Sequence, residues 1–208
     1  MTVWEGIYLA SGKYSSEQNM DNNWKKSVIL YIQDLVYMLM GIFLVFLLLF
    51  RVIVVSGDSM YSTLLDGDYL LLLGNVFYHE PEYGDIVVIS KESFDHGTPI
   101  VKRVIATEGQ TVDIDFENGI VYVDAVALSE PYINNLTTMN EGNHFPLTVE
   151  DDCVFVLGDN RGVSRDSRDP VIGQVDKREI LGKAVFLMIP GTSHGDLPRD
   201  LDRIGVIK

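Results

Sequence analysis

The strongest constraint in this sequence is an uncharged apolar run at residues 35–50. Widened to residues 28–50, the run has 23 residues with Asp34 as its only charge, and about 20 apolar residues cover a bilayer core about 30 Å thick. The pattern predicts a membrane-spanning helix, which residues 52–55 extend past Arg51. A cleaved secretory signal would have a shorter apolar region, of about 7–15 residues, and a small-x-small site after it. The run therefore favours a retained anchor.

The charges that flank this run predict an orientation. Lys25 and Lys26 precede it, and Arg51 alone follows. Because cytoplasmic flanks carry an excess of Lys and Arg, we expect the N-terminus in the cytoplasm and a single pass through the cell membrane. The predicted parts are a polar, mobile cytoplasmic tail at residues 1–27, a transmembrane signal-anchor helix at 28–55 and an extracytoplasmic domain at 56–208.

Charge and composition narrow the possible partners. The chain has 16 Lys and Arg against 30 Asp and Glu, a net charge of −14, and a field of that sign repels nucleic-acid backbones. The single cysteine, Cys153, forms no intramolecular disulfide and is expected to be a small hydrophobe in a buried strand. The four histidines have no metal-ligand spacing: His79, His96, His144 and His194. We expect neither nucleic acid nor a metal.

Beyond the anchor, short apolar segments alternate with Gly, Pro and Asp clusters, and no stretch has helical periodicity over a helix length. This pattern is typical of a mainly β domain, with an antiparallel sheet or a barrel-like form. Predicted strands span residues 68–73, 85–89, 100–105, 111–116, 120–123, 154–157 and 184–189. Asn118-Gly119 predicts a tight hairpin turn. Residues 129–149 are expected to form a long surface loop.

Three polar segments interrupt the β pattern. Ser59 lies in a Gly-rich bend, where an exposed hydroxyl beside backbone N–H groups suits acyl transfer, although a loop serine is usually a turn former. Lys102 lies inside an apolar strand, where burial favours the neutral amine that a general base requires. A lone strand lysine is more often paired or snorkelling. Residues 157–168, dense in charges and hydroxyls, form by composition alone a solvated loop.

Taken together and in order, these segments resemble the conserved boxes of the bacterial type I signal peptidases, which are Ser-Lys membrane proteases, in their Gram-positive-like form. The preceding anchor is also in its family place. The matching segments are Ser56-Gly-Asp-Ser-Met-Tyr-Ser-Thr-Leu64, Gly84-Asp-Ile-Val-Val88, Val101-Lys-Arg-Val104 and Gly158-Asp-Asn-Arg161 followed by Ser164, Asp166 and Arg168. Four boxes in the correct order make the resemblance specific.

The resemblance implies roles for the residues nearest the chemistry. Ser59 would be the nucleophile and Lys102 its general base, with Met60 packed beside them. Ser164 matches a serine whose hydroxyl orients the lysine. The lysine base also argues against the endoplasmic-reticulum branch of the family, which uses a histidine there.

The resemblance also implies supporting residues. Asp166 and Arg168 match an ion pair that supports the site. Asp159 and Arg103 match the family pattern as structural braces.

Two positions depart from the family pattern. Residue 62 is serine where the family usually has proline, which would loosen the turn behind the nucleophile. Gly57 stands where some members carry a serine that completes the oxyanion hole, and Gram-positive-type members often have glycine there. We therefore expect the oxyanion site at Ser59 and Gly57, with the Ser59 amide as a donor and the second donor left open.

The function that the resemblance implies is removal of N-terminal signal peptides from exported preproteins, through an acyl-enzyme on Ser59 and without a cofactor. Secretory preproteins with small residues at −1 and −3 would bind as an added strand, and membrane lipid would be the other partner. A catalytically inactive anchored relative, acting in peptide binding or surface-fibre assembly, is the alternative. Such a relative would be expected to lose the serine or the lysine. A self-cleaving Ser-Lys repressor would carry an N-terminal DNA-binding domain instead of an apolar run.

Overall fold

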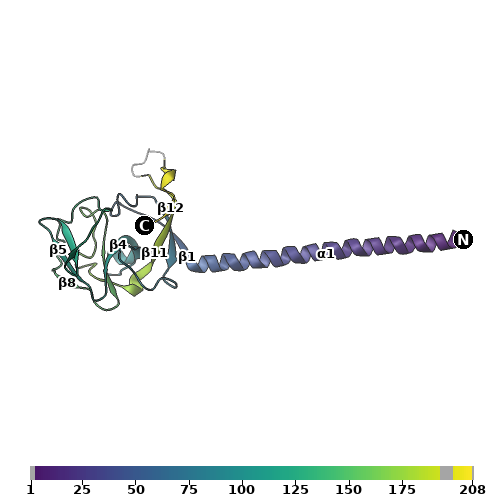
Figure 1. The fold of residues 1–208 in the computed structure, drawn as a ribbon, viewed down its shortest axis with the longest axis horizontal. Coiled ribbons are helices and arrows are strands. Elements are labelled where there is room, and N and C mark those ends of the chain that lie inside the picture. Colours follow the sequence, from purple (N-terminus) through teal and green to yellow (C-terminus); the bar gives the residue numbers. More distant parts are fainter. Residues whose placement is uncertain (1–2, 193–198, 208) are drawn as a thin grey trace. The chain divides into compact units, whose positions relative to one another are not determined.

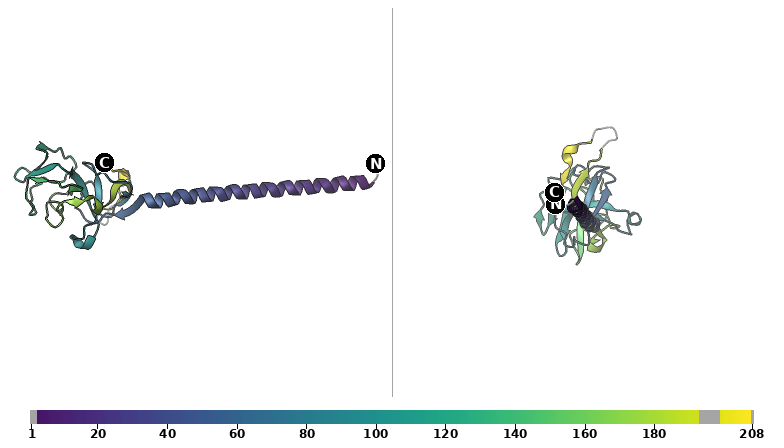
Figure 2. Two further views of the ribbon diagram at one scale, coloured as in Figure 1. Left: turned by 90° about the horizontal axis from the view of Figure 1, so that it is seen from below. Right: turned by 90° about the vertical axis from the view of Figure 1, so that its right-hand side faces the viewer.

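The structure is a computed structural model that describes the backbone of residues 3–192 and 199–207. The chain divides into two compact units, Met1–Leu47 and Leu48–Lys208. The first unit holds one helix, α1 (Val3–Leu49), which runs without interruption in Figure 1 and Figure 2. Its segment Trp24–Leu49 is long and apolar enough to cross a membrane, and the most apolar part is not buried within the protein.

The bounds of α1 differ from the predicted bounds at both ends. The chain before residue 28, which was predicted to be a polar tail, is helical from Val3 onward. The helix ends at Leu49, and the next residues form strand β1 (Phe50–Val54) rather than continuing the helix to residue 55. Val52, Ile53 and Val54 are β-branched and pair in register with β2. An apolar run alone does not distinguish such a strand from a helix.

The second unit is built from short strands. After β1 come β2 (Tyr69–Gly74), β3 (Ile86–Ile89), β4 (Ile100–Thr107), β5 (Thr111–Asp115), β6 (Ile120–Val123), β7 (Val126–Ala127), β8 (Leu147–Thr148), β9 (Cys153–Leu157), β10 (Val175–Asp176), β11 (Ile180–Ile189) and β12 (Gly205–Val206). Single turns of 3₁₀ helix lie at Asp95–Gly97, Lys177–Glu179 and Leu201–Arg203.

The strands form two antiparallel sheets, which confirms the predicted fold class. The larger sheet has the order β1-β2-β11-β3-β4-β9-β10, with β12 paired to β11. The smaller sheet has the order β7-β6-β5-β8, and Figure 1 shows β5 and β8 side by side. The predicted hairpin joins β5 to β6, with Gly119 in the left-handed region at φ 70°.

The core of the second unit explains why one strand can bury a lysine. Side chains of β4 and β9 alternate between two apolar clusters: Ile105 and Phe155 belong to one, and Val104 and Val156 to the other. Both faces of these strands are therefore covered. A polar side chain on the same strand must then lie inside the protein.

Candidate active site

Two predicted side chains meet at the start of β4. The Nζ of Lys102 donates to the Oγ of Ser59 at 2.8 Å and to the carbonyl oxygen of Val101 at 3.0 Å. Lys102 is 3% exposed, as its apolar flanks predict, and Ser59 is partly exposed in the turn after β1. The pair therefore joins a buried amine to a hydroxyl that solvent or a ligand can reach.

Burial lowers the pKa of Lys102 from 10.5 to about 8. The charges of Asp166, Glu141 and Asp159 act in the opposite direction, and the Arg168 guanidinium acts with burial. A substantial fraction of the amine is thus neutral slightly above neutral pH. A neutral amine in hydrogen-bond contact with a hydroxyl can accept its proton.

The turn that carries Ser59 is fixed by its own backbone and by a neighbouring carboxylate. Gly57 has φ 85°, a conformation that favours glycine, and its N–H donates to Asp66 Oδ1 at 2.8 Å. The Ser59 N–H donates to no acceptor among the described residues. Met60 is buried in the core beneath the turn, while Ser62 is exposed. The Gly57 amide is therefore already engaged, and the second oxyanion donor stays open.

Residues after β9 hold the turn from the other side. The Asn160 backbone N–H donates to the Ser59 carbonyl at 3.0 Å, and the Asn160 side-chain amide donates to the Asp58 carbonyl at 3.0 Å. A Cβ at Gly158 would meet Ser164 Cβ at 2.5 Å and the Ser59 carbonyl oxygen at 2.6 Å. Only glycine allows the two segments to approach this closely.

Ser164 lies next to this contact but does not bond the lysine here. Its hydroxyl is buried against Gly158 and lies 3.5 Å from the Arg165 carbonyl oxygen. The structure shows no hydrogen bond between Ser164 and Lys102 among the described contacts. The orienting role assigned to Ser164 by resemblance stays a prediction.

The structure brings Asp166 and Arg168 together as a fully buried ion pair. Arg168 Nε lies 2.8 Å from Asp166 Oδ1, and Nη2 lies 2.9 Å from Oδ2. Asp166 Oδ2 also accepts from the Gly158 N–H at 3.0 Å. The pair therefore fixes the same glycine that supports the Ser59 turn.

Arg103 and Asp159 form a second buried bidentate pair. Nε and Nη2 of Arg103 donate to Asp159 at 2.8 and 2.7 Å. Thr63, from the Ser59 turn, donates to the same carboxylate at 2.5 Å, and the Tyr132 ring stacks 4.1 Å from the guanidinium carbon. Such a pair ties β4, the turn and the segment after β9 to one another.

Sequence reasoning assigned no role to the partners of a third buried arginine. Arg161 donates to the Gly158 carbonyl at 3.0 Å, pairs with Glu130 at 2.5 Å and bonds the Thr137 hydroxyl. Glu130 and Thr137 belong to residues 129–149, so that this predicted surface loop in fact supports the site from within. Composition alone indicated that residues 157–168 form a solvated loop. This interpretation is also wrong, because the segment contains buried charges that are paired. A buried arginine requires a carboxylate nearby, which is the signal that could have indicated Glu130.

A largely apolar cavity of about 370 Å³ opens beside Ser59. Its walls come from the end of β1 with the turn after it, and from the segment that leads into β4. The lining residues are Ile53, Val54, Val55, Ser56, Ser59, Thr98, Pro99, Ile100 and Val101. The hollow is therefore concave and mostly apolar, as ligand-binding sites usually are.

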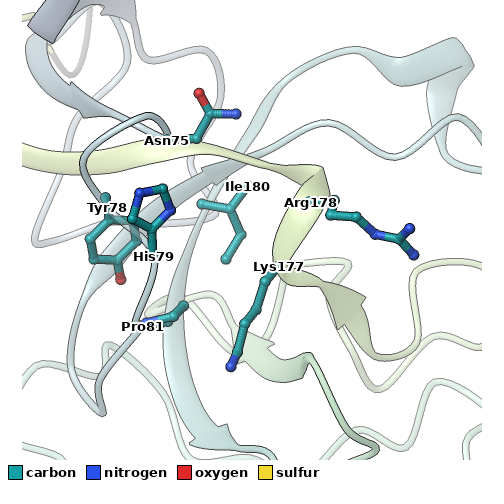
Figure 3. Close-up of a pocket in the computed structure, with 7 residues that line it drawn as sticks. All are labelled: Asn75, Tyr78, His79, Pro81, Lys177, Arg178 and Ile180. Atoms are coloured by element: carbon teal, nitrogen blue, oxygen red, sulfur yellow. The ribbon is translucent and has the colours of Figure 1, made fainter.

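A second hollow, of about 280 Å³, contains none of the predicted site residues (Figure 3). Its two long basic side chains are already neutralised: Lys177 lies 2.9 Å from Glu108, and Arg178 lies 2.5 Å from Asp176. The Arg178 guanidinium points away from the other labelled side chains in Figure 3. This hollow therefore offers no unpaired Lys or Arg side chain among its lining residues.

The described residues include no group of three or more His, Cys, Asp or Glu side chains that could hold a metal ion. His194 lies outside the described residues. Cys153 is free and partly exposed at the start of β9 rather than fully buried, and burial raises the pKa of its thiol. A raised thiol pKa disfavours the reactive thiolate.

Comparison with known proteins gives one consistent answer. The family model described as "Signal peptidase, peptidase S26" matches residues 28–189. A probable signal peptidase I-1 from Synechocystis sp. is 38% identical over 151 residues, 69% of this chain and 73% of the relative. Signal peptidase I from Bacillus licheniformis is 30% identical over 181 residues, 83% of this chain and 95% of the relative. A crystal structure of a signal peptidase I from Enterococcus faecalis V583 is 31% identical, with a TM-score of 0.41 over 50% of this chain and 96% of that chain.

Proposed function

The chain belongs to the peptidase S26 family of signal peptidases, and from that starting point we propose that it is a membrane-anchored serine endopeptidase that removes N-terminal signal peptides from exported preproteins. The observation that carries the proposal is the 2.8 Å hydrogen bond between the buried Lys102 amine and the Ser59 hydroxyl beside the apolar cavity. An inactive relative would have no need to bury an amine against a serine, since burial is costly for a lysine.

The proposed reaction begins with proton transfer within the dyad. The neutral Lys102 amine accepts the Ser59 proton as Oγ attacks the scissile carbonyl carbon, and the Ser59 N–H donates to the oxyanion. The Lys102 ammonium then protonates the leaving amine of the mature protein as the peptide C–N bond breaks. Water, deprotonated by the same amine, attacks the acyl carbon, and the bond from Ser59 Oγ to that carbon breaks as the Lys102 ammonium returns a proton to Oγ. The signal peptide then leaves with a free carboxylate. Ser164 would orient the amine during these steps.

The cavity beside Ser59 supports a preference for small substrate side chains. A peptide bound as an extended strand directs alternate side chains to the same face, so residues −1 and −3 before the cut would enter the hollow together. Its apolar walls, at Ile53, Ile100 and Val101, leave about 370 Å³ for both. Charged side chains at these two positions would be disfavoured, because they would leave water for apolar walls.

The anchor supports a location at the membrane surface. Trp24–Leu49 is a candidate span, and residues 50–58 alone separate it from Ser59 in the sequence. Lys25 and Lys26 at the N-terminal end of this segment, against Arg51 alone after it, support a cytoplasmic N-terminus and an extracytoplasmic catalytic domain. Anchoring would confine enzyme and signal peptide to one bilayer and raise their effective concentration. Protease digestion of intact and of opened cells checks this orientation.

The deciding experiment incubates the detergent-solubilised full chain with a radiolabelled preprotein. We expect the parent to yield mature protein and a signal peptide, and Ser59→Ala to yield neither. Ser62→Ala, which changes an exposed serine in the same turn, is the matched control and should retain cleavage. Cleavage by Ser59→Ala close to that of the parent would contradict the proposal.

A further inference from the structure

One nitrogen of Arg168, Nη2, has more acceptor oxygens around it than it has hydrogens to donate. Its Nη2 lies 2.9 Å from Asp166 Oδ2, 3.0 Å from each of the carbonyl oxygens of Arg161 and Ser164, and 3.2 Å from Glu141 Oε1. A guanidinium NH₂ group has two hydrogens. Glu141, the most distant of the four, is therefore the least satisfied partner.

The second carboxylate oxygen of Glu141 has no partner at all. Oε2 is buried without a hydrogen bond among the described atoms. Burial raises the pKa of Glu141, the charges of Asp166 and Asp169 act in the same direction, and Arg168 opposes them together with a bond from the Asp166 backbone. A carboxylate in such a place costs free energy, so its position calls for an explanation other than stability.

The charges around the lysine do not cancel. Four charged groups face Lys102: Asp166, Glu141, Asp159 and Arg168. Asp159 is neutralised by Arg103, and Asp166 takes two hydrogen bonds from Arg168. Glu141 pairs with the same guanidinium, so Asp166, Arg168 and Glu141 together carry one negative charge that no cation among them neutralises. Glu141 comes from the 129–149 loop rather than from the matched sequence boxes.

We propose that Glu141 is a positioning residue of the active site, which pairs with Arg168 alongside Asp166 and supplies the negative charge that stabilises the Lys102 ammonium formed when Ser59 loses its proton. The inference rests on the proposed Ser-Lys function. The same charge opposes formation of the neutral amine at rest. Glu141 thus lowers activity at low pH, where less of the amine is neutral. At high pH it makes proton transfer from Ser59 faster.

The test compares kcat/KM against pH for the solubilised full chain and for Glu141→Gln, on one preprotein substrate. Removing the charge should move the acid limb to lower pH by roughly 0.5–1 pH unit and lower the plateau several-fold. Glu141→Asp, which keeps the charge, should return the limb to within a few tenths of the parental position. Glu117→Gln removes an equal charge from the exposed β5–β6 turn and should leave both quantities unchanged.

The possible results separate this inference from the function on which it rests. A limb that stays in place in Glu141→Gln, with or without loss of rate, would mean that the residue is merely structural and would overturn the inference. An equal shift in Glu117→Gln would mean that net charge alone matters, and it would overturn the inference as well. Activity in Ser59→Ala would instead overturn the Ser-Lys function. Far-ultraviolet circular dichroism of each variant establishes that the fold is retained.

Discussion

The Lys102 amine and the Ser59 hydroxyl meet at 2.8 Å although 43 residues separate them in the sequence. The lysine is placed by a strand that is covered on both faces, and the serine by a turn held between Asp66 and Asn160. Neither side chain depends on a flexible loop for its position. This rigidity makes the consequences of single substitutions specific enough to predict.

Cleavage should depend on the protonation of Lys102. Because its pKa is lowered to about 8, the rate should rise tenfold per pH unit well below pH 8 and level off above it. Lys102→Met should lose roughly 10²–10⁴-fold in kcat/KM at every pH. Combining it with Ser59→Ala should cost little beyond Ser59→Ala alone, because the two groups act as a unit. An additive loss in the double variant would show that they act separately.

The same lysine should weaken the fold where it is charged. The folded-state pKa is lowered, so both states are protonated below pH 8 and the burial cost is then fully present, at roughly 3 kcal/mol. Between pH 8 and 10.5 only the unfolded state binds the proton, and the parent gains stability as pH rises. Lys102→Met should therefore unfold at a higher temperature than the parent at pH 7, with the difference shrinking towards pH 10.5. A constant difference across this range would exclude a buried charge as the cause.

Gly158→Ala should damage the site more than the fold. The new Cβ would meet the Ser164 side chain and the Ser59 carbonyl oxygen, at an overpacking cost of about 1–3 kcal/mol. Displacement of the Ser59 turn should lower kcat/KM by about 10²-fold or more. Gly205→Ala has no atom within 4 Å of its added Cβ and should change neither quantity. Parental activity in Gly158→Ala would show that the turn can move without harm.

Substrate choice should follow the walls of the cavity. Ile53→Ala enlarges the hollow beside Ser59, so cleavage of substrates with valine or leucine at −1 or −3 should improve about tenfold relative to alanine substrates. Val52→Ala, on the same strand but outside the cavity lining, should keep the parental preference. Specificity is measured as the ratio of kcat/KM values. Identical ratios in the two variants would remove Ile53 from the subsites.

Replacing Arg103 alone should lower the free energy of unfolding more than replacing both Arg103 and Asp159. Arg103→Met leaves a buried carboxylate with Thr63 as its side-chain partner, and a loss of about 3–5 kcal/mol in unfolding free energy is expected. Asp159→Asn in the same chain should recover part of that loss. Denaturant unfolding of the single and double variants measures the coupling. No recovery in the double variant would mean that Arg103 acts by packing on Tyr132 rather than by charge.

Strands were predicted correctly where apolar and polar residues alternate clearly or where turn residues mark the end of the segment. Thr111–Asp115 alternates strictly and ends at Asn118-Gly119, and both strands of that hairpin are confirmed. β1 was assigned to the helix because its apolar residues follow the apolar run with only Arg51 between them. Pairing with β2, a contact between distant residues, decides its conformation, and such contacts leave no local signal.

The candidate site was predictable only in part for the same reason. Ser59 and Lys102 were identified only because four family boxes occur in the correct order, since a loop serine is usually a turn former and a strand lysine is more often paired. Glu130 and Glu141 lie in a polar loop where acidic residues are ordinary. What sets them apart is their ion pairs with Arg161 and Arg168, which only the folded chain reveals.

The three buried arginine pairs also determine how the protein responds to its ionic surroundings. At physiological ionic strength, salt screens the interaction between exposed charges over a distance of about 8 Å, and it screens buried pairs far less. Arg178, 90% exposed and paired with Asp176, would lose its attraction in concentrated salt, whereas Arg103, Arg161 and Arg168 would keep theirs. The three buried pairs are thereby insulated from changes in the medium, whereas the exposed pair responds to them.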